Sequence, residues 1–131
     1  MLVAEKVMGF SDVKWNSWSG YHGKSPEYRQ IADIPDYSTD NTAVWEVVEK
    51  LRQDGFTVVV AANFQSNLQA CMIFEGVPTM AFPPKDVFLH LAEEAAFAVS
   101  DVGRRIGAKC VQTQAKTAPL AICLAALEVV Q

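Results

Sequence analysis

Two adjacent arginines between glycines are the residues of this chain whose chemistry best suits a ligand. Arg104 and Arg105 lie in "GRRIG", residues 103 to 107, and Lys109 follows shortly after. Guanidinium groups bind phosphate through paired hydrogen bonds, and neighbouring glycines let the backbone approach closely. Alternatively, the two cations end a helix and interact favourably with its dipole. Both interpretations are open on sequence alone.

An aromatic segment supplies the second group of candidate binding residues. It runs from residue 11 to residue 37 and mixes tryptophans and tyrosines with basic residues. Aromatic rings stack on nucleotide bases, and nearby cations contact phosphates, so Trp18, Tyr28 and Arg29 are candidate ligand contacts. Phe82 is a further candidate stacking face. The alternative is that the segment folds back and buries its rings over the core, with Phe82 also filling the core.

No combination of residues typical of catalysis stands out. Of the two histidines, His22 lies in the aromatic segment, and His90 is explained by a helix-surface ion pair with Glu94. The three cysteines have no metal-ligand spacing and are expected to be buried free thiols: Cys71, Cys110 and Cys123. We therefore expect a protein that is not an enzyme and that holds no metal and no cofactor.

Length and composition favour one domain spanning residues 1–131. Half of the residues are hydrophobic, which is ample for a single core. The formal net charge of −4 provides no overall attraction to nucleic acid or to an anionic membrane. No apolar stretch is long enough to cross a bilayer, and charged residues interrupt the N-terminal apolar run, so we expect a cytoplasmic protein without a signal peptide.

The clearest element is a helix from about Asp40 to Asp54, with Asp40 as its N-terminal cap and Gly55 as its C-terminal turn. Glu46 and Lys50 are spaced for an ion pair on the exposed side. Trp45 falls at the edge of the apolar stripe, where we expect it to pack under the aromatic segment. The stripe itself recurs with helical spacing at Val44, Val47, Val48 and Leu51.

The remaining elements alternate between strands and helices. A short helix is expected at residues 2–9, followed by a long loop at 11–37. Strands are expected at 56–62, 69–75 and 109–114, with a further short strand at 79–82 and a helix beginning at Pro83. A final helix is capped by Thr117, with the predicted buried stripe Leu120, Cys123, Leu124 and Leu127. This order predicts an α+β domain in which helices cover a small antiparallel sheet.

Three blocks of the sequence resemble the phage ABA-sandwich domain family of bacteriophages and prophages. They are "LVAEKVMGF" near the start, "YSTDNTAVWEVVEKL" in the middle and "TAPLAICLAALEVV" at the end. The resemblance implies a helix–sheet–helix sandwich and a phage or prophage origin, hence a host bacterial cytoplasm. The chain departs from the family pattern at about 83–107, where family members are shorter, so we expect a helical insertion there.

The resemblance and the candidate residues together lead to a functional hypothesis. Small phage proteins of comparable size include anti-defence sponges, such as the Thoeris anti-defence protein, which sequester cyclic nucleotide-like immune signals. We expect sequestration of a nucleotide-derived signal, either a cyclic ADP-ribose variant or a cyclic oligonucleotide. The alternative is a module that inhibits or adapts a host protein without a small ligand; nucleic acid is disfavoured by the acidic balance. Apolar residues of the 83–107 segment, Phe88, Leu89 and Phe97, predict a homo-oligomer.

Overall fold

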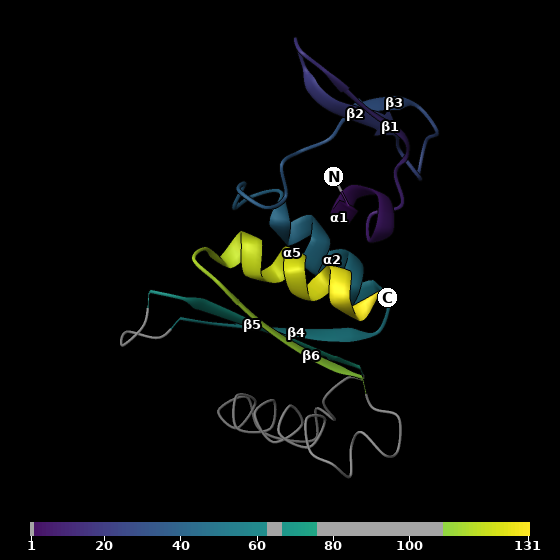
Figure 1. The fold of residues 1–131 in the computed structure, drawn as a ribbon. Coiled ribbons are helices and arrows are strands. Elements are labelled where there is room, and N and C mark those ends of the chain that lie inside the picture. Colours follow the sequence, from purple (N-terminus) through teal and green to yellow (C-terminus); the bar gives the residue numbers. More distant parts are fainter. Residues whose placement is uncertain (1, 63–66, 76–108) are drawn as a thin grey trace.

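The computed structural model describes residues 2–62, 67–75 and 109–131. It shows an α+β protein with two three-stranded antiparallel sheets, which confirms the predicted fold class (Figure 1). The first sheet consists of β1 (Ser11–Asn16), β2 (Gly20–Lys24) and β3 (Ile31–Asp33). The second sheet consists of β4 (Phe56–Ala62), β5 (Gln69–Glu75) and β6 (Cys110–Ala115).

The long loop predicted for residues 11–37 is wrong, because these residues form the first sheet. β1 pairs with β2 and β2 pairs with β3, each antiparallel. The strands have at most six residues, and β1 and β3 are exposed along most of their length. Strands this short and this polar leave no sustained period of two in the sequence, so the alternation that would have revealed them is missing.

The second sheet agrees with the sequence prediction. β4 and β5 form the expected hairpin, with Val58 opposite Ile73. β6 lies on the other side of β5, and Val111 is also opposite Ile73. The predicted strand at 79–82 and the predicted helix and insertion between Pro83 and Gly107 lie outside the described residues.

Three helices complete the described fold: α1 (Leu2–Lys6), α2 (Val44–Gln53) and α5 (Ala118–Val129). α5 packs against β5 and β6, while α2 contacts both α5 and β4 (Figure 1). The Asp40 Oδ1 accepts hydrogen bonds from the N–H groups of Thr42, at 2.7 Å, and Ala43, at 3.1 Å. Asp40 therefore caps the turn that leads into α2, whereas the helix itself begins later than predicted, at Val44, with Ala43 at its N-cap and no side-chain cap. Gly55 ends this region at φ 90°, a conformation that suits glycine.

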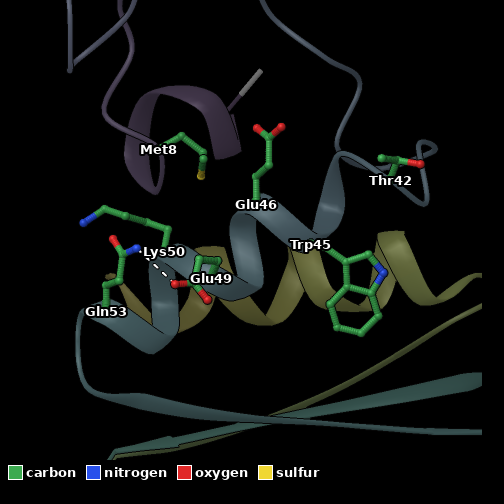
Figure 2. Close-up of a pocket in the computed structure, with 7 residues that line it drawn as sticks. All are labelled: Met8, Thr42, Trp45, Glu46, Glu49, Lys50 and Gln53. Carbon is green, nitrogen blue, oxygen red and sulfur yellow. Dashed lines mark hydrogen bonds between the residues drawn. The ribbon is translucent and has the colours of Figure 1, made fainter.

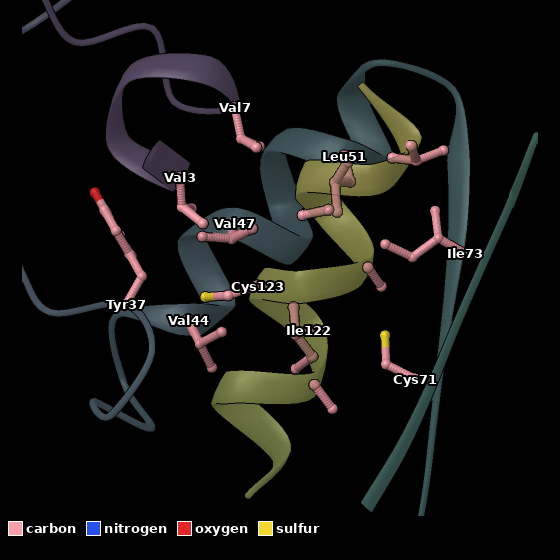
Figure 3. Packing of buried hydrophobic residues seen from close by; sticks show 14 of the residues in the cluster. Val3, Val7, Tyr37, Val44, Val47, Leu51, Cys71, Ile73, Ile122 and Cys123 are labelled. Atoms are coloured by element: carbon pink, nitrogen blue, oxygen red, sulfur yellow. The ribbon is translucent and has the colours of Figure 1, made fainter. Parts of the chain in front are cut away.

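The hydrophobic core lies between the second sheet and the three helices (Figure 3). Val47 and Leu51 of α2 are fully buried, as are Cys71 and Ile73 of β5. Ile122 of α5 is almost fully buried between them. The core stripe predicted for α2 is therefore confirmed, with Val48 packed at its margin.

The predicted stripe of α5 is partly wrong. Leu120 is 37% exposed and Leu124 is 43% exposed, whereas Cys123 is buried. The side that faces the core instead contains Ala121, Ile122, Cys123, Ala125, Ala126 and Val129. α5 is apolar on nearly every side, so apolar spacing could not tell which side faces the sheet. Its cap is as predicted: the Thr117 side chain accepts a hydrogen bond from the Leu120 N–H.

Two predictions for the surface of α2 are also wrong. Trp45 is 61% exposed, so it does not pack under residues 11–37. Lys50 pairs with Asp54, with 2.7 Å between Nζ and Oδ1, and not with Glu46. Burial, followed by the nearby charge of Glu46, raises the pKa of Tyr37 to about 12.

The cysteines bear out the sequence interpretation for two positions. Cys71 and Cys123 are buried free thiols. Burial raises the pKa of Cys71 to about 12 and the pKa of Cys123 to about 11. Cys110 is only half-buried. Within the described ranges, no helix is long and apolar enough to cross a membrane.

Candidate binding surface

The first sheet brings two large aromatic residues to the same place. Trp15 of β1 lies directly opposite Tyr21 of β2. Side chains of directly opposed residues project on the same face of an antiparallel sheet and lie close together. The turn between the strands places Trp18 next to this pair, and the Trp18 N–H donates a 2.7 Å hydrogen bond to the Asn16 side chain. We call Trp15, Trp18 and Tyr21 the aromatic surface.

The aromatic surface is open to solvent. Trp15 is 62% exposed, Trp18 is 96% exposed and Tyr21 is 42% exposed. Large rings contribute the most apolar area of any side chain, so leaving three of them uncovered on one short hairpin is unfavourable for an isolated protein. Clustered exposed aromatic residues are characteristic of surfaces that bind a partner. The expectation that these rings are buried over the core is therefore wrong.

The first sheet is tightly packed around Gly23, next to the aromatic surface. Gly23 lies two residues after Tyr21, and a Cβ atom there would be 3.1 Å from Val13 and 3.2 Å from Ile34. Ile34 is half-buried and packs against the main core. The sheet is thus attached to the core at this end, while Trp15 and Trp18 project from the other.

The charges on the first sheet are balanced. Residues 11–37 contain three basic and four acidic side chains. Lys24 pairs with Asp12 at 2.6 Å, which lowers the pKa of Asp12 and raises the pKa of Lys24. One of the few cations of the first sheet is therefore already paired. This surface does not resemble a basic site built for a phosphate.

A small hollow of about 240 Å³ borders the aromatic surface. Tyr21 forms one wall, Ile34 and Pro35 form another, and the Asp36 carboxylate lies at its edge. The Asp36 Oδ1 accepts hydrogen bonds from the Ser38 hydroxyl, at 2.6 Å, and from the Ser38 N–H, at 3.2 Å. The hydroxyl contact lowers the pKa of Asp36, so this edge is negatively charged at neutral pH.

Among the described residues of the predicted ligand site, Trp18 lies apart from Tyr28 and Arg29. Trp18 lies in the β1–β2 turn, whereas Tyr28 and Arg29 lie in the β2–β3 turn. These turns are at opposite ends of β2, because consecutive antiparallel strands are joined at alternate ends. Lys109 precedes β6 in the second sheet, and its carbonyl accepts a hydrogen bond from the Glu75 N–H. Phe82, Arg104 and Arg105 lie outside the described residues.

Trp15 and Tyr21 are not among the ligand contacts predicted from the sequence. The available signal was the arrangement W-N-S-W-S-G-Y, residues 15–21, in which two rings flank a turn-forming Ser-Trp-Ser-Gly. Serine and glycine are typical of tight turns, and aromatic residues of strands. A hairpin with opposed rings could have been predicted from this stretch.

A second, shallower groove runs along α2 beside Trp45 (Figure 2). It encloses about 490 Å³ and is lined by Met8, Thr42, Trp45, Glu46, Glu49, Lys50 and Gln53. Its main charges are paired within α2. Arg52 donates two hydrogen bonds to Glu49, at 2.6 Å and 2.8 Å, and Gln53 donates a third at 3.1 Å. The groove has one exposed ring, and the charges beside it are already paired with each other. It is therefore a weaker candidate for a binding surface than the aromatic surface.

No metal centre is apparent in the part of the chain that the structure describes, where no three His, Cys, Asp or Glu side chains are grouped to hold an ion. His22 of the first sheet lies between Lys14 and Asp33 on the neighbouring strands. Lys14, His22 and Asp33 in a row do not form a nucleophile with its base.

Comparison with known proteins gives one match. The family model of the phage ABA sandwich domain matches residues 1–77, more than half of the chain. No curated protein and no solved structure matches. The matched range contains the whole first sheet, α1, α2, β4 and β5. The first two sequence blocks that resemble the family lie in it, whereas the third, in α5, lies beyond it.

Proposed function

The chain belongs to the phage ABA sandwich domain family, and on that premise we propose that it is a non-catalytic bacteriophage protein that binds a partner through its aromatic surface. The observation that supports this most directly is the exposure of Trp15, Trp18 and Tyr21 on one short hairpin. The protein acts, in this proposal, in the cytoplasm of the infected bacterium.

The first candidate partner is a host protein that the phage protein inhibits or adapts. Tryptophan and tyrosine are enriched among the residues that dominate the binding energy of protein interfaces, where they insert into pockets of the partner. The charges of residues 11–37 are balanced, which suits the polar rim of such an interface. A protein partner also explains why the rings project beyond the core and do not line a deep cavity.

The second candidate partner is a nucleotide-derived immune signal, which the protein would sequester to block host defence. The opposed rings of Trp15 and Tyr21 favour this candidate, because every nucleotide base offers a flat face for stacking. Lys14, the neighbour of Trp15, is the nearest cation in sequence for a phosphate. Arg104, Arg105 and Phe82 remain the proposed anionic-ligand residues for this second candidate.

The proposal is tested by purifying the tagged protein from bacteria that express it and identifying the molecules that remain bound. The same experiment separates the two candidates. Tagged wild-type protein is purified beside the variant Trp15→Ala/Trp18→Ala. The matched control is Trp45→Ala, which removes an equally exposed ring from α2. Each preparation is divided: one half is analysed for bound proteins by mass spectrometry, and the other is denatured and analysed for released nucleotides.

The proposal predicts a partner that is captured by wild type and by Trp45→Ala and lost from Trp15→Ala/Trp18→Ala. A protein in the first half supports the host-protein candidate, and a nucleotide in the second half supports sequestration. Calorimetry with the purified partner then measures the loss of affinity, expected at about 2–4 kcal/mol for a central aromatic contact. A partner retained equally by the double variant would overturn the proposal.

A further inference from the structure

Helix α5 has an exposed apolar ridge that the rest of the described fold does not use. A helix that is apolar on all sides is normally covered on all sides. Glu128 is the sole charged residue within α5 (Ala118–Val129). The helix packs against the second sheet, α2 and α1, yet Leu120 and Leu124 remain exposed to solvent.

The ridge is regular and ends in opposite charges. Lys116, Leu120, Leu124 and Glu128 follow one another at intervals of four residues, and all four are exposed. Leu120, Leu124 and Glu128 are four residues apart within α5 and form one ridge, and such ridges pack into the grooves of a second helix. Lys116 lies just before the Thr117 cap, beyond the N-terminal end of the ridge, and Glu128 lies in the last turn. In sequence, the two charges are equally far from the midpoint between the leucines.

This pattern is complementary to itself in the antiparallel direction. We propose that two copies of the chain associate through α5, with the helices antiparallel and a two-fold axis between Leu120 and Leu124. Leu120 of one protomer then packs against the partner's Leu124, and Glu128 faces the partner's Lys116. A contact of this kind uses the same surface on both protomers, so it closes at a dimer.

The charges identify a second copy as the occupant of the ridge. An unrelated partner would need only an apolar groove, and opposite charges placed symmetrically at the two ends would serve no purpose. In an antiparallel second copy, each Lys116 faces the partner's Glu128, so both charges are paired. This surface is separate from the aromatic surface, and the dimer does not depend on the proposed partner.

Sedimentation equilibrium over a micromolar concentration series tests the dimer. Wild type is expected at twice the 14.4 kDa chain mass at the upper concentrations. Leu124→Glu puts a charge into the apolar contact and should raise the dimer dissociation constant about 100-fold or more. The control Ile31→Glu, which changes an exposed apolar residue of β3, should leave the mass unchanged.

A charge exchange provides the sharper test. Glu128→Lys alone and Lys116→Glu alone each place like charges opposite one another, so each should weaken the dimer about tenfold. The combination Lys116→Glu/Glu128→Lys should restore wild-type association. Both changes suit the helix dipole, so weaker association cannot be attributed to loss of α5, and circular dichroism checks this. A monomer mass for wild type at every concentration, or a combined variant as weak as the single ones, would overturn the proposal.

Discussion

The two sheets have the same topology and opposite surroundings. Each contains three antiparallel strands in sequential order. In the second sheet, Cys71 and Ile73 of β5 are fully buried beneath α5. In the first sheet, the side chains of Trp15 and Trp18 extend into solvent, and exposed residues predominate in β1 and β3. One sheet is therefore a layer of the core, and the other is a support for surface residues.

The difference lies in the kind of apolar residue. β4 and β5 contain mainly aliphatic and β-branched side chains, with Phe56 and Phe74 as rings without a polar atom, and they fill a core against small residues of α5 such as Ala121 and Ala125. β1 and β2 contain aromatic residues among charged and polar ones. Rings with a polar atom are well suited to contacts that form and dissociate in water. We infer that the first sheet exists for recognition, and the predictions below test that separation.

The largest expected effect is a loss of core packing in α5. Ile122→Ala removes a buried side chain next to the second sheet and should lower the free energy of unfolding by about 2–5 kcal/mol. Leu124→Ala, two residues away on the exposed ridge, should cost less than about 1 kcal/mol when measured on monomeric protein at low concentration. Urea unfolding of the two variants measures both values. Equal losses of unfolding free energy in the two variants would show that Ile122 does not lie on the core side of α5 with Leu124 on the exposed side.

The next effect is a loss of stability at alkaline pH that originates in the core layer. Cys71 and Cys123 are protonated in the folded protein up to their raised pKa values, about 12 and about 11. In the unfolded chain these thiols ionise near 9.0, so their contribution is complete below that pH and is lost as pH rises towards 11 and 12.

Urea midpoints recorded near pH 8 and near pH 10 should therefore fall with rising pH. The fall should be smaller in Cys71→Ala, although that variant starts from a lower stability because a buried atom is lost. An unchanged pH dependence in Cys71→Ala would contradict the burial of this thiol.

A smaller effect is expected for a change confined to the first sheet. A Cβ atom at Gly23 would lie 3.0 Å from the backbone oxygen of Ser11 and 3.1 Å from Val13. Gly23→Ala should therefore cost about 1–3 kcal/mol through crowding between β1 and β2. Hydrogen exchange should show faster exchange of amides in β1 and β2, with β4 and β5 unchanged. Equal acceleration in both sheets would mean that they unfold as one unit.

The smallest effect on stability is expected at the tip of the first sheet. Trp18 is almost fully exposed, and its side chain contributes little to folding. Trp18→Ala should change the free energy of unfolding by no more than about 0.5 kcal/mol, while it weakens partner binding. Thermal unfolding measures the first quantity. A large loss of stability would place Trp18 in a packed environment and remove the main argument for a binding surface.

The sequence allowed the second sheet and its helices to be predicted because their signals are local and strong. Asp40, the α2 stripe and Gly55 mark a helix, and the β-branched run at 56–62 marks a strand. The first sheet could not be found in the same way, since its strands are short and its stability comes from pairing between segments. The side of α5 that faces the core was also beyond prediction, because Leu124 and Ile122 are both apolar and only the packed neighbours distinguish them.

The candidate site was predictable only in part. Trp18 stays a predicted contact, and Trp15 and Tyr21 come to lie opposite each other only through the register of β1 and β2. Tyr28 and Arg29 were grouped with Trp18 because they are near it in sequence, whereas the β-meander places them at the other end of the sheet. Trp45 illustrates the same limit, since one residue of rotation around α2 separates a core position from a surface one.

Hydroxyl-radical footprinting of the free protein and of its captured complex tests the central claim most directly. Oxidation of each ring is read by mass spectrometry, and Trp45 on α2 serves as the internal reference. The account predicts that Trp15, Trp18 and Tyr21 are oxidised readily in the free protein and are protected in the complex, while oxidation of Trp45 is unchanged. Protection of Trp45 with continued oxidation of Trp15 and Trp18 would contradict it.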